Sequence, residues 1–145
     1  MQIADFIVRP VYTIDQNEPV VEAARLMRRF GVKELVVTRD RAGRATPMGL
    51  VRDTDIVLKA IAQNPRALMS TMVADVMEMV LTTLRSTDTV VHAVQHMSAC
   101  ETEKSPVLSP QGELLGLVSL TTLLACLRTR SGSGHFTQRE WTTLM

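Results

Sequence analysis

The sequence predicts an α+β fold in which two β-α-β-β-α repeats pack with pseudo-two-fold symmetry. Three observations support this prediction. Similar residues recur at an offset of about 70 positions, both copies alternate short β-like runs with segments of helical periodicity, and a chain of 145 residues accommodates one such pair. Because a copy of roughly 55 residues is only marginally stable alone, we expect the two copies to form one cooperative unit with their sheets packed together.

The repeat is visible in short matching segments along the chain. Matching pairs are Ala4-Asp5 with Ala74-Asp75, Val20-Val21-Glu22-Ala23 with Val90-Val91-His92-Ala93, and Gly49-Leu50-Val51 with Gly116-Leu117-Val118. The offset falls to about 67 in the last pair, which indicates about three extra residues between Arg39 and Pro47 of the first copy. A surface loop would tolerate that insertion.

The first copy contains start and stop signals for each of its elements. The predicted elements are a strand over Pro10–Ile14, a helix from Pro19, strands over Leu35–Thr38 and Met48–Val51 with Gly43 in the turn between them, and a helix from Asp53 or Thr54. Pro19 suits the first helical position, with Asn17 or Glu18 near the cap. Gly31 is a typical helix end.

The second copy repeats these elements in the same order. The predicted elements are a strand over Val80–Leu84, a helix capped by Asp88, strands over Pro106–Leu108 and Leu114–Ser119 with Gly112 in the turn, and a helix from about Thr121. The apolar face of the first of these helices contains Val90, Ala93, Val94 and Met97. Its spacing predicts an amphipathic helix packed against a sheet.

The repeats define the expected domain boundaries. We expect a first repeat over residues 1–61, a connector over 62–73 that is partly helical after Pro65, a second repeat over 74–130 and a flexible tail over 131–145. The tail opens with Ser131-Gly132-Ser133-Gly134 and contains Trp141, which would leave the tail either disordered or docked.

Composition excludes several function classes. Sixteen Lys and Arg against fifteen Asp and Glu give a formal charge of +1, far from the basic surface that non-specific nucleic-acid binding needs. Aromatic residues are too scarce for base-stacking platforms. No apolar run approaches about 18 residues, and the N-terminus has no basic start followed by an apolar stretch. We expect a soluble cytoplasmic protein that binds neither membrane nor nucleic acid.

The order of elements, together with the segments Gly49–Asp55 and Gly116–Thr122, resembles a tandem pair of CBS (cystathionine β-synthase) domains, often called a Bateman module. The resemblance covers about residues 3–128, and Lys104-Ser105-Pro106-Val107 looks like the basic-x-Pro-Val second strand of that family. It implies a regulatory protein that binds AMP, ADP, ATP or S-adenosylmethionine in clefts between the copies and requires no cofactor. It further implies a homodimer through the repeat helices and an effector protein that receives the signal in trans.

The family's ligand motif is Gly-apolar-x-Thr/Ser-x-x-Asp, where the acid accepts hydrogen bonds from ribose and the hydroxyl and helix N-terminus donate to phosphate. Carried over, the first copy keeps Asp55 but has Arg52 at the hydroxyl position. The second keeps Ser119 but has Thr122 in place of the acid. Arg52 would either contact phosphate directly or pair with Asp53 or Asp55 and close the site. The first copy is the better candidate site.

The family's general geometry adds strand residues to this set of candidate contacts. They are Tyr12, Thr13, Lys33 and Val36 in the first copy and Thr82, Lys104 and Pro106 in the second. Each of these residues could equally be a strand residue that only packs or faces water. Asp55 could likewise be a first-turn acid stabilised by the helix dipole.

Other chemistries have weaker support. The sequence contains no nucleophile elbow, phosphate-loop glycine pattern or Ser-His-Asp order, so we do not expect an enzyme. His92, His96 and Cys100 recur along one side of a predicted helix without an evident fourth ligand, which disfavours a metal site. Cys100 and Cys126 are predicted to be buried thiols. The main alternative function is a structural dimerisation module without ligands, and a metal-dependent oligomer is a third.

Overall fold

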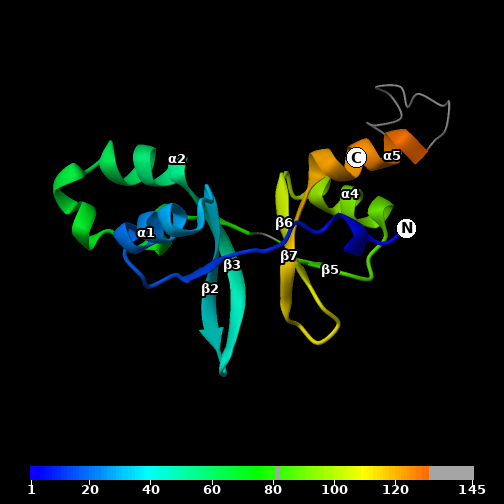
Figure 1. The fold of residues 1–145 in the computed structure, drawn as a ribbon, viewed down its shortest axis with the longest axis horizontal. Coiled ribbons are helices and arrows are strands. Elements are labelled where there is room, and N and C mark those ends of the chain that lie inside the picture. The colour runs from blue at the N-terminus through cyan, green and yellow to red at the C-terminus, as the bar shows by residue number, and fades with distance from the viewer. Residues whose placement is uncertain (81, 131–145) are drawn as a thin grey trace. The chain divides into compact units, whose positions relative to one another are not determined.

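The structure is a computed structural model that describes residues 1–80 and 82–130, and it divides the chain into two compact units (Figure 1). One unit spans Val11–Val80, and the other combines Met1–Pro10 with the described residues of the second half. Each unit contains one small sheet and several helices. The prediction of a mixed α+β fold is confirmed. The proposed tail over 131–145, with Trp141, lies outside the described residues.

The Val11–Val80 unit contains a four-stranded sheet in the order β1-β2-β3-β4, in which β1 pairs parallel to β2 and the other pairs are antiparallel. Its elements are β1 (Thr13–Asp15), α1 (Val20–Phe30), β2 (Glu34–Arg41), β3 (Arg44–Arg52), α2 (Asp53–Asp55), the π-helical η2 (Ile56–Ile61), the 3-10 helix η3 (Pro65–Ser70), α3 (Val73–Val76) and β4 (Glu78–Met79). The helical turn predicted after Pro65 is therefore present as η3.

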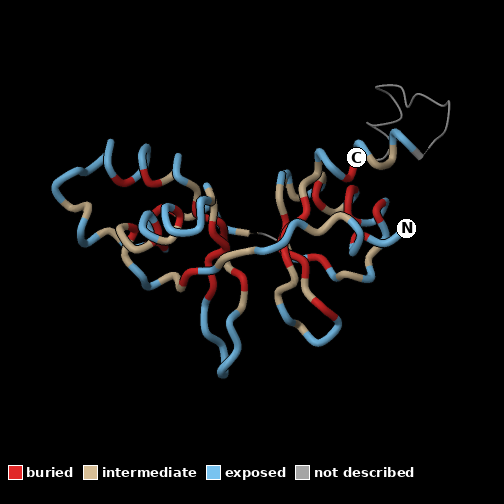
Figure 2. Tube along the Cα trace, in the orientation of Figure 1, coloured by how far each residue is buried: buried red, intermediate tan, exposed pale blue. Residues whose placement is uncertain are grey.

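One aliphatic core holds this unit together. The buried residues come from α1, from the central strands and from the helices on either side of the connector. Buried stretches of the chain are red in the Cα trace of Figure 2. Val20, Ala23 and Met27 share one face of α1 because of their helical spacing, and they pack with Leu35 and Val37 of β2. The helices and the sheet of this unit are therefore joined through a single hydrophobic cluster.

The second unit contains a three-stranded sheet in the order β5-β6-β7. Its elements are the 3-10 helix η1 (Ile3–Phe6), β5 (Leu84–Arg85), α4 (Val90–Ala99), β6 (Lys104–Leu108), β7 (Leu114–Ser119) and α5 (Leu120–Arg130). The predicted apolar face of α4 is confirmed, because Val90, Ala93, Val94 and Met97 are all buried. Ile3 of η1 is fully buried in the same cluster.

The segment that opens each sequence repeat packs in the unit formed by the rest of the other repeat. Val8, near the start of the first repeat, forms an antiparallel bridge with Leu117 of β7, and its N–H donates to the Leu117 carbonyl oxygen at 2.8 Å. In the other unit, β4 pairs with β3 at Gly49 and Leu50. The compact units differ from the sequence repeats, because the first segment of each repeat belongs to the unit that contains the rest of the other repeat. The repeat boundaries at residues 61 and 73 stay predictions.

The helix ends differ in detail from those predicted. Gly31 ends α1 as expected, with a φ of 65° and its N–H directed at the Met27 carbonyl oxygen. Pro19 is the N-cap rather than the first helical residue. Thr89, not Asp88, caps α4 by accepting the His92 N–H at 3.1 Å. The Asp88 carboxylate instead accepts the Arg85 N–H at 2.8 Å and stabilises the preceding turn.

The strands at the start of each repeat are shorter than predicted, and the hairpin of the first repeat is longer. The strands expected over Pro10–Ile14 and Val80–Leu84 are present only as β1 and β5. The three extra residues of the first copy extend β2 and β3 to a two-residue turn at Ala42 and Gly43, whose φ values are 52° and 79°. Such a turn matches the twist of the flanking strands, so the insertion lengthens the ladder rather than a loop.

Replacing Thr89 with alanine is expected to lower the free energy of unfolding by about 1 kcal/mol, because the His92 amide then loses its acceptor at the start of α4. Urea unfolding followed by circular dichroism measures the effect. Thr89→Ser is the control, because serine keeps the hydroxyl group. Equal stability of the alanine and serine variants would contradict this assignment of the cap.

Candidate functional site

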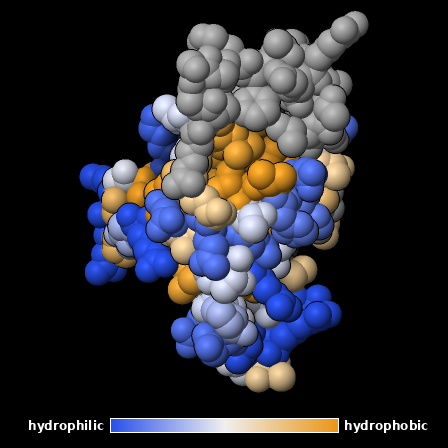
Figure 3. All heavy atoms as spheres, turned by 90° about the vertical axis from the view of Figure 1, so that its right-hand side faces the viewer, coloured by the Kyte–Doolittle hydropathy of each residue, from blue (hydrophilic) through white to orange (hydrophobic). Residues whose placement is uncertain are grey.

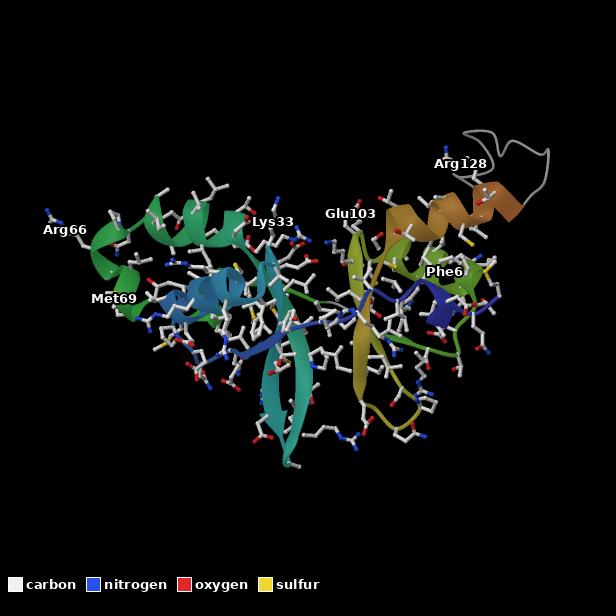
Figure 4. The ribbon with its side chains drawn as sticks, in the orientation of Figure 1. Phe6, Lys33, Arg66, Met69, Glu103 and Arg128 are labelled. Carbon is white, nitrogen blue, oxygen red and sulfur yellow. The ribbon has the colours of Figure 1, made fainter. Side chains whose placement is uncertain are left out.

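The candidate motif of the first repeat lies where β3 ends at Arg52 and α2 begins at Asp53. The Asp53 N–H donates to the Lys33 carbonyl oxygen at 3.0 Å, which fixes the start of α2 beside the start of β2. Figure 4 labels Lys33 at this end of the sheet. The motif therefore has a defined backbone frame formed by the central hairpin and the helix that follows it.

Asp55 is the acid of the motif, and it has two partners. Its Oδ2 accepts the Arg52 N–H at 2.9 Å, and its Oδ1 lies 3.1 Å from Lys59 Nζ one turn later. The side chain is only 13% exposed. Lys59 Nζ also donates to the Val76 carbonyl oxygen at 3.3 Å, so Lys59 connects Asp55 to α3. Asp55 is thus held in one orientation in the first turn of the helical stretch formed by α2 and η2, where the helix dipole stabilises a negative charge.

The ion pairs of Arg52 are with Glu34 and Glu78. Its Nε lies 3.7 Å from Glu34 Oε2, and one terminal nitrogen lies 3.7 Å from Glu78 Oε2. Glu34 is directly opposite Arg52 in the β2–β3 ladder, and Glu78 belongs to β4. Of the two alternatives for Arg52, the ion pair with Asp53 or Asp55 has the wrong partners, because the guanidinium extends across the sheet to Glu34 and Glu78 rather than along the helix.

The strand candidates of the first repeat lie on or just before β1 and β2. Thr13 is paired with Val36 in the parallel ladder, and the Val36 N–H donates to the Tyr12 carbonyl oxygen at 2.9 Å. The Tyr12 ring stacks on Phe30 with a centroid separation of 4.1 Å and an interplanar angle of 9°. Sequence reasoning missed Phe30, although its place at the end of an amphipathic helix beside a β-like run was a usable signal. Val36 is fully buried, whereas Thr13 and Lys33 are exposed.

The corresponding motif of the second repeat contains only neutral groups. Ser119 Oγ accepts the Thr122 N–H at 3.1 Å and donates to Thr122 Oγ1 at 2.7 Å. The serine hydroxyl therefore caps α5, and a threonine hydroxyl stands where the first repeat has a carboxylate. This junction presents no charge to a ligand through these two residues.

Of the remaining candidates of the second repeat, Thr82 lies just before β5 and makes polar contacts with β6 and α4. Ser105 Oγ donates to the Thr82 carbonyl oxygen at 3.1 Å, and Thr82 Oγ1 lies 2.5 Å from His96 Nε2. Lys104 and Pro106 are paired with Ser119 and Leu117 in the β6–β7 ladder. The contact of Thr82 with a histidine was not predicted, because the two residues lie 14 positions apart in the sequence.

The histidines of α4 and the two cysteines were also singled out in the sequence. The rings of His92 and His96 stack with centroids 5.8 Å apart, and within residues 1–80 and 82–130 no three or more His, Cys, Asp or Glu side chains gather as a metal site would require. Both cysteines are free and half-buried rather than fully buried as expected. Across the described part of the chain, no helix has the length and apolarity to span a bilayer.

Relatives share this chain's sequence over much of its length. It is 25% identical over 126 residues to the uncharacterised protein MK0525 of Methanopyrus kandleri, which covers 86% of this chain and 61% of that protein. It is 36% identical over 114 residues to an inosine-5′-monophosphate dehydrogenase of Korarchaeum cryptofilum, which covers 79% of this chain and 22% of the dehydrogenase. The chain therefore spans less than two thirds of the length of both relatives.

Solved structures show the same fold. The CBS domain pair of protein MJ0100, in complex with 5′-methylthioadenosine and S-adenosyl-L-methionine, has a TM-score of 0.65 at 20% identity and covers 90% of this chain and 98% of that one. A hexameric CBS-CP12 protein from bloom-forming cyanobacteria has a TM-score of 0.70 at 22% identity, covering 94% and 73%. The CBS domain family model matches residues 3–61 and 73–129. The chain therefore belongs to the CBS domain family and contains a tandem pair of these domains.

Proposed function

We propose that this protein is a regulatory CBS pair that senses an adenine nucleotide or related adenosyl ligand through its first repeat and signals to an effector protein in trans. The ligand class is AMP, ADP, ATP or S-adenosylmethionine, bound without a required cofactor and without catalysis, in the cytoplasm. The observation that carries the proposal is the fixed carboxylate of Asp55 in the first turn of the helical stretch formed by α2 and η2. The second repeat, with Ser119 and Thr122 in the corresponding place, is the weaker site.

The chemistry of Asp55 suits a ribose. Each of its oxygens has one partner, and a carboxylate oxygen accepts more than one hydrogen bond, so both keep capacity for donors such as the 2′- and 3′-hydroxyl groups. Arg52 and Lys59 fix the orientation before a ligand arrives, which lowers the entropic cost of binding. The neighbouring residues Tyr12, Thr13 and Lys33 are the proposed contacts for the remainder of the ligand, whereas the Val36 side chain is fully buried and does not reach a ligand. The adenosyl complex of the MJ0100 domain pair supports this ligand class.

We further propose that the protein forms a homodimer through its repeat helices. Val57, Leu58 and Ile61 follow Asp55 on η2, and all three are exposed, with Leu58 at 62%. In the other unit, Figure 3 shows apolar side chains gathered on the side that carries α4 and α5. A second copy would cover such helix faces in a closed two-fold assembly. Because η2 continues directly from α2, a ligand on Asp55 would bias the dimer to the extent that it binds two packings with different affinity.

A thermal-shift panel tests the sensor against the structural alternative. A ligand that binds only the folded chain at ten times its dissociation constant adds about 1.4 kcal/mol, which corresponds to a rise of about 3 to 6 °C in melting temperature. We expect such a rise with at least one of AMP, ATP, S-adenosylmethionine and 5′-methylthioadenosine. Guanosine is the control for the base. No rise with any adenosyl compound at millimolar concentration would refute the sensor and leave the ligand-free dimerisation module.

A further inference from the structure

Arg52 lies among acidic side chains at the junction of β3 and α2. Arg52 is the residue that stands where the motif has a hydroxyl donor for phosphate, and it is already paired with Glu34 and Glu78. The Arg52 side chain is 34% exposed and that of Glu34 is 23% exposed, so this pair is only partly screened by solvent. A phosphate that approaches the guanidinium must therefore displace or approach two carboxylates.

The charged residues in the segments of this unit that form the junction sum to a negative charge. The charged residues in the segments 33–34 and 52–59 and at position 78 are Lys33, Glu34, Arg52, Asp53, Asp55, Lys59 and Glu78. Four of these are acids and three are bases, which leaves one net negative charge. Lys59 is bound to Asp55 and to the Val76 carbonyl oxygen. Lys33 is exposed, and a hydrated ammonium group on a flexible stem attracts a distant anion weakly.

A phosphate group is negatively charged, like the sum of the residues at this junction. A phosphate monoester has about −1.5 to −2 charges near pH 7, so AMP would bring two more negative charges to the Glu34–Arg52–Glu78 group. A thioether at the 5′ position is neutral, and a sulfonium is positive. The single positive charge of the Arg52 guanidinium is opposed by two glutamates, half-buried Glu34 and exposed Glu78, each at 3.7 Å.

We infer that the first repeat selects adenosyl ligands that carry no phosphate, of the 5′-thioether or sulfonium type, and discriminates against AMP, ADP and ATP. This inference rests on the proposed function and narrows it. Asp55 supplies the ribose recognition that all of these ligands share, and the ion pairs of Arg52 with Glu34 and Glu78 set the selectivity between them.

The experiment compares 5′-methylthioadenosine with AMP by calorimetric titration of the full chain. The wild type is expected to bind 5′-methylthioadenosine about tenfold more tightly than AMP. In Glu34→Gln/Glu78→Gln the amides no longer neutralise Arg52, so AMP binding is expected to tighten about tenfold while that of 5′-methylthioadenosine is unchanged. Glu18→Gln/Glu22→Gln is the matched control, because it removes the same number of charges from an exposed residue just before α1 and a half-buried residue in its first turn, neither of which pairs with Arg52, and it is expected to leave the preference of the wild type in place.

Salt dependence of the wild type gives a second readout that needs no variant. If Arg52 is neutralised, raising salt from about 50 mM to about 500 mM leaves AMP binding unchanged or tighter, because salt screens repulsion. AMP binding that weakens with salt, equal affinity for both ligands in the wild type, or an unchanged preference in Glu34→Gln/Glu78→Gln would overturn the selectivity alone. Absence of binding by every adenosyl compound would overturn the proposed function as well.

Discussion

Gly116→Ala is expected to destabilise the unit that contains η1 and β7 by about 1 to 3 kcal/mol and to detach the N-terminal segment from β7. A Cβ at this position would overlap Ile7 Cγ2 and lie 2.5 Å from the Val8 carbonyl oxygen. The Val8 backbone cannot retreat freely, because it exchanges two hydrogen bonds with Leu117, at 2.8 and 3.4 Å. The glycine is therefore required by the close approach of the crossing segment, and the added methyl group must break that bridge.

Urea unfolding and hydrogen exchange measured by mass spectrometry test this prediction together. The variant should show a lower midpoint and faster exchange over residues 3–8, with the sheet β2–β3 of the other unit unaffected. Gly43→Asn is the control, because nothing lies within 4 Å of a Cβ there and asparagine tolerates its φ of 79°. Unchanged exchange in the N-terminal segment of Gly116→Ala would show that the segment does not depend on this contact.

The repeat, the order of elements and the core of α4 were predictable from the sequence, because each depends on local periodicity. Offsets of about 70 and 67 are readable wherever similar apolar residues recur. The buried face of α4 follows from the spacing of Val90, Ala93, Val94 and Met97. Gly31 and Gly43 were identifiable because positive φ angles favour glycine.

The partners of Arg52 were not predictable in the same way. A two-residue turn at Ala42 and Gly43 sets the register near the hairpin tip, where Thr38 is opposite Pro47. An irregularity between Val37 and Thr38 then shifts the ladder by one residue, and this shift brings Arg52 opposite Glu34. A β-bulge inserts a single residue without a distinctive sequence pattern, so the register beyond it depends on tertiary packing.

Local sequence patterns also could not predict that the first segment of each repeat packs in the other unit. Ala4-Asp5 and Ala74-Asp75 match as sequence, but nothing in either segment says which unit it joins. Ile3 is buried with α4 and Val76 is buried with α1, so long-range packing decides the assignment. The second carboxylate of the Arg52 network, Glu78, is placed by this exchange, because it belongs to the segment that crosses to β3.

Asp55→Asn is expected to weaken binding of 5′-methylthioadenosine about tenfold to a hundredfold, because an amide offers one acceptor oxygen where the carboxylate offers two charged ones. The substitution keeps an oxygen that can accept the Arg52 N–H, so α2 retains its cap. Asp75 supplies the matched control, since its Oδ2 accepts the Met72 N–H at 3.0 Å at the same position of α3. Asp75→Asn therefore controls for the loss of a capping charge, whereas Asp55→Asn also removes the ion pair with Lys59.

The decisive measurement is the dissociation constant of 5′-methylthioadenosine for the wild type, Asp55→Asn and Asp75→Asn, determined by calorimetry on folded protein. A ribose held by Asp55 gives wild-type affinity in Asp75→Asn and a loss of tenfold or more in Asp55→Asn. Equal dissociation constants in all three proteins would contradict the account, because Asp55 would then be a helix cap and nothing more.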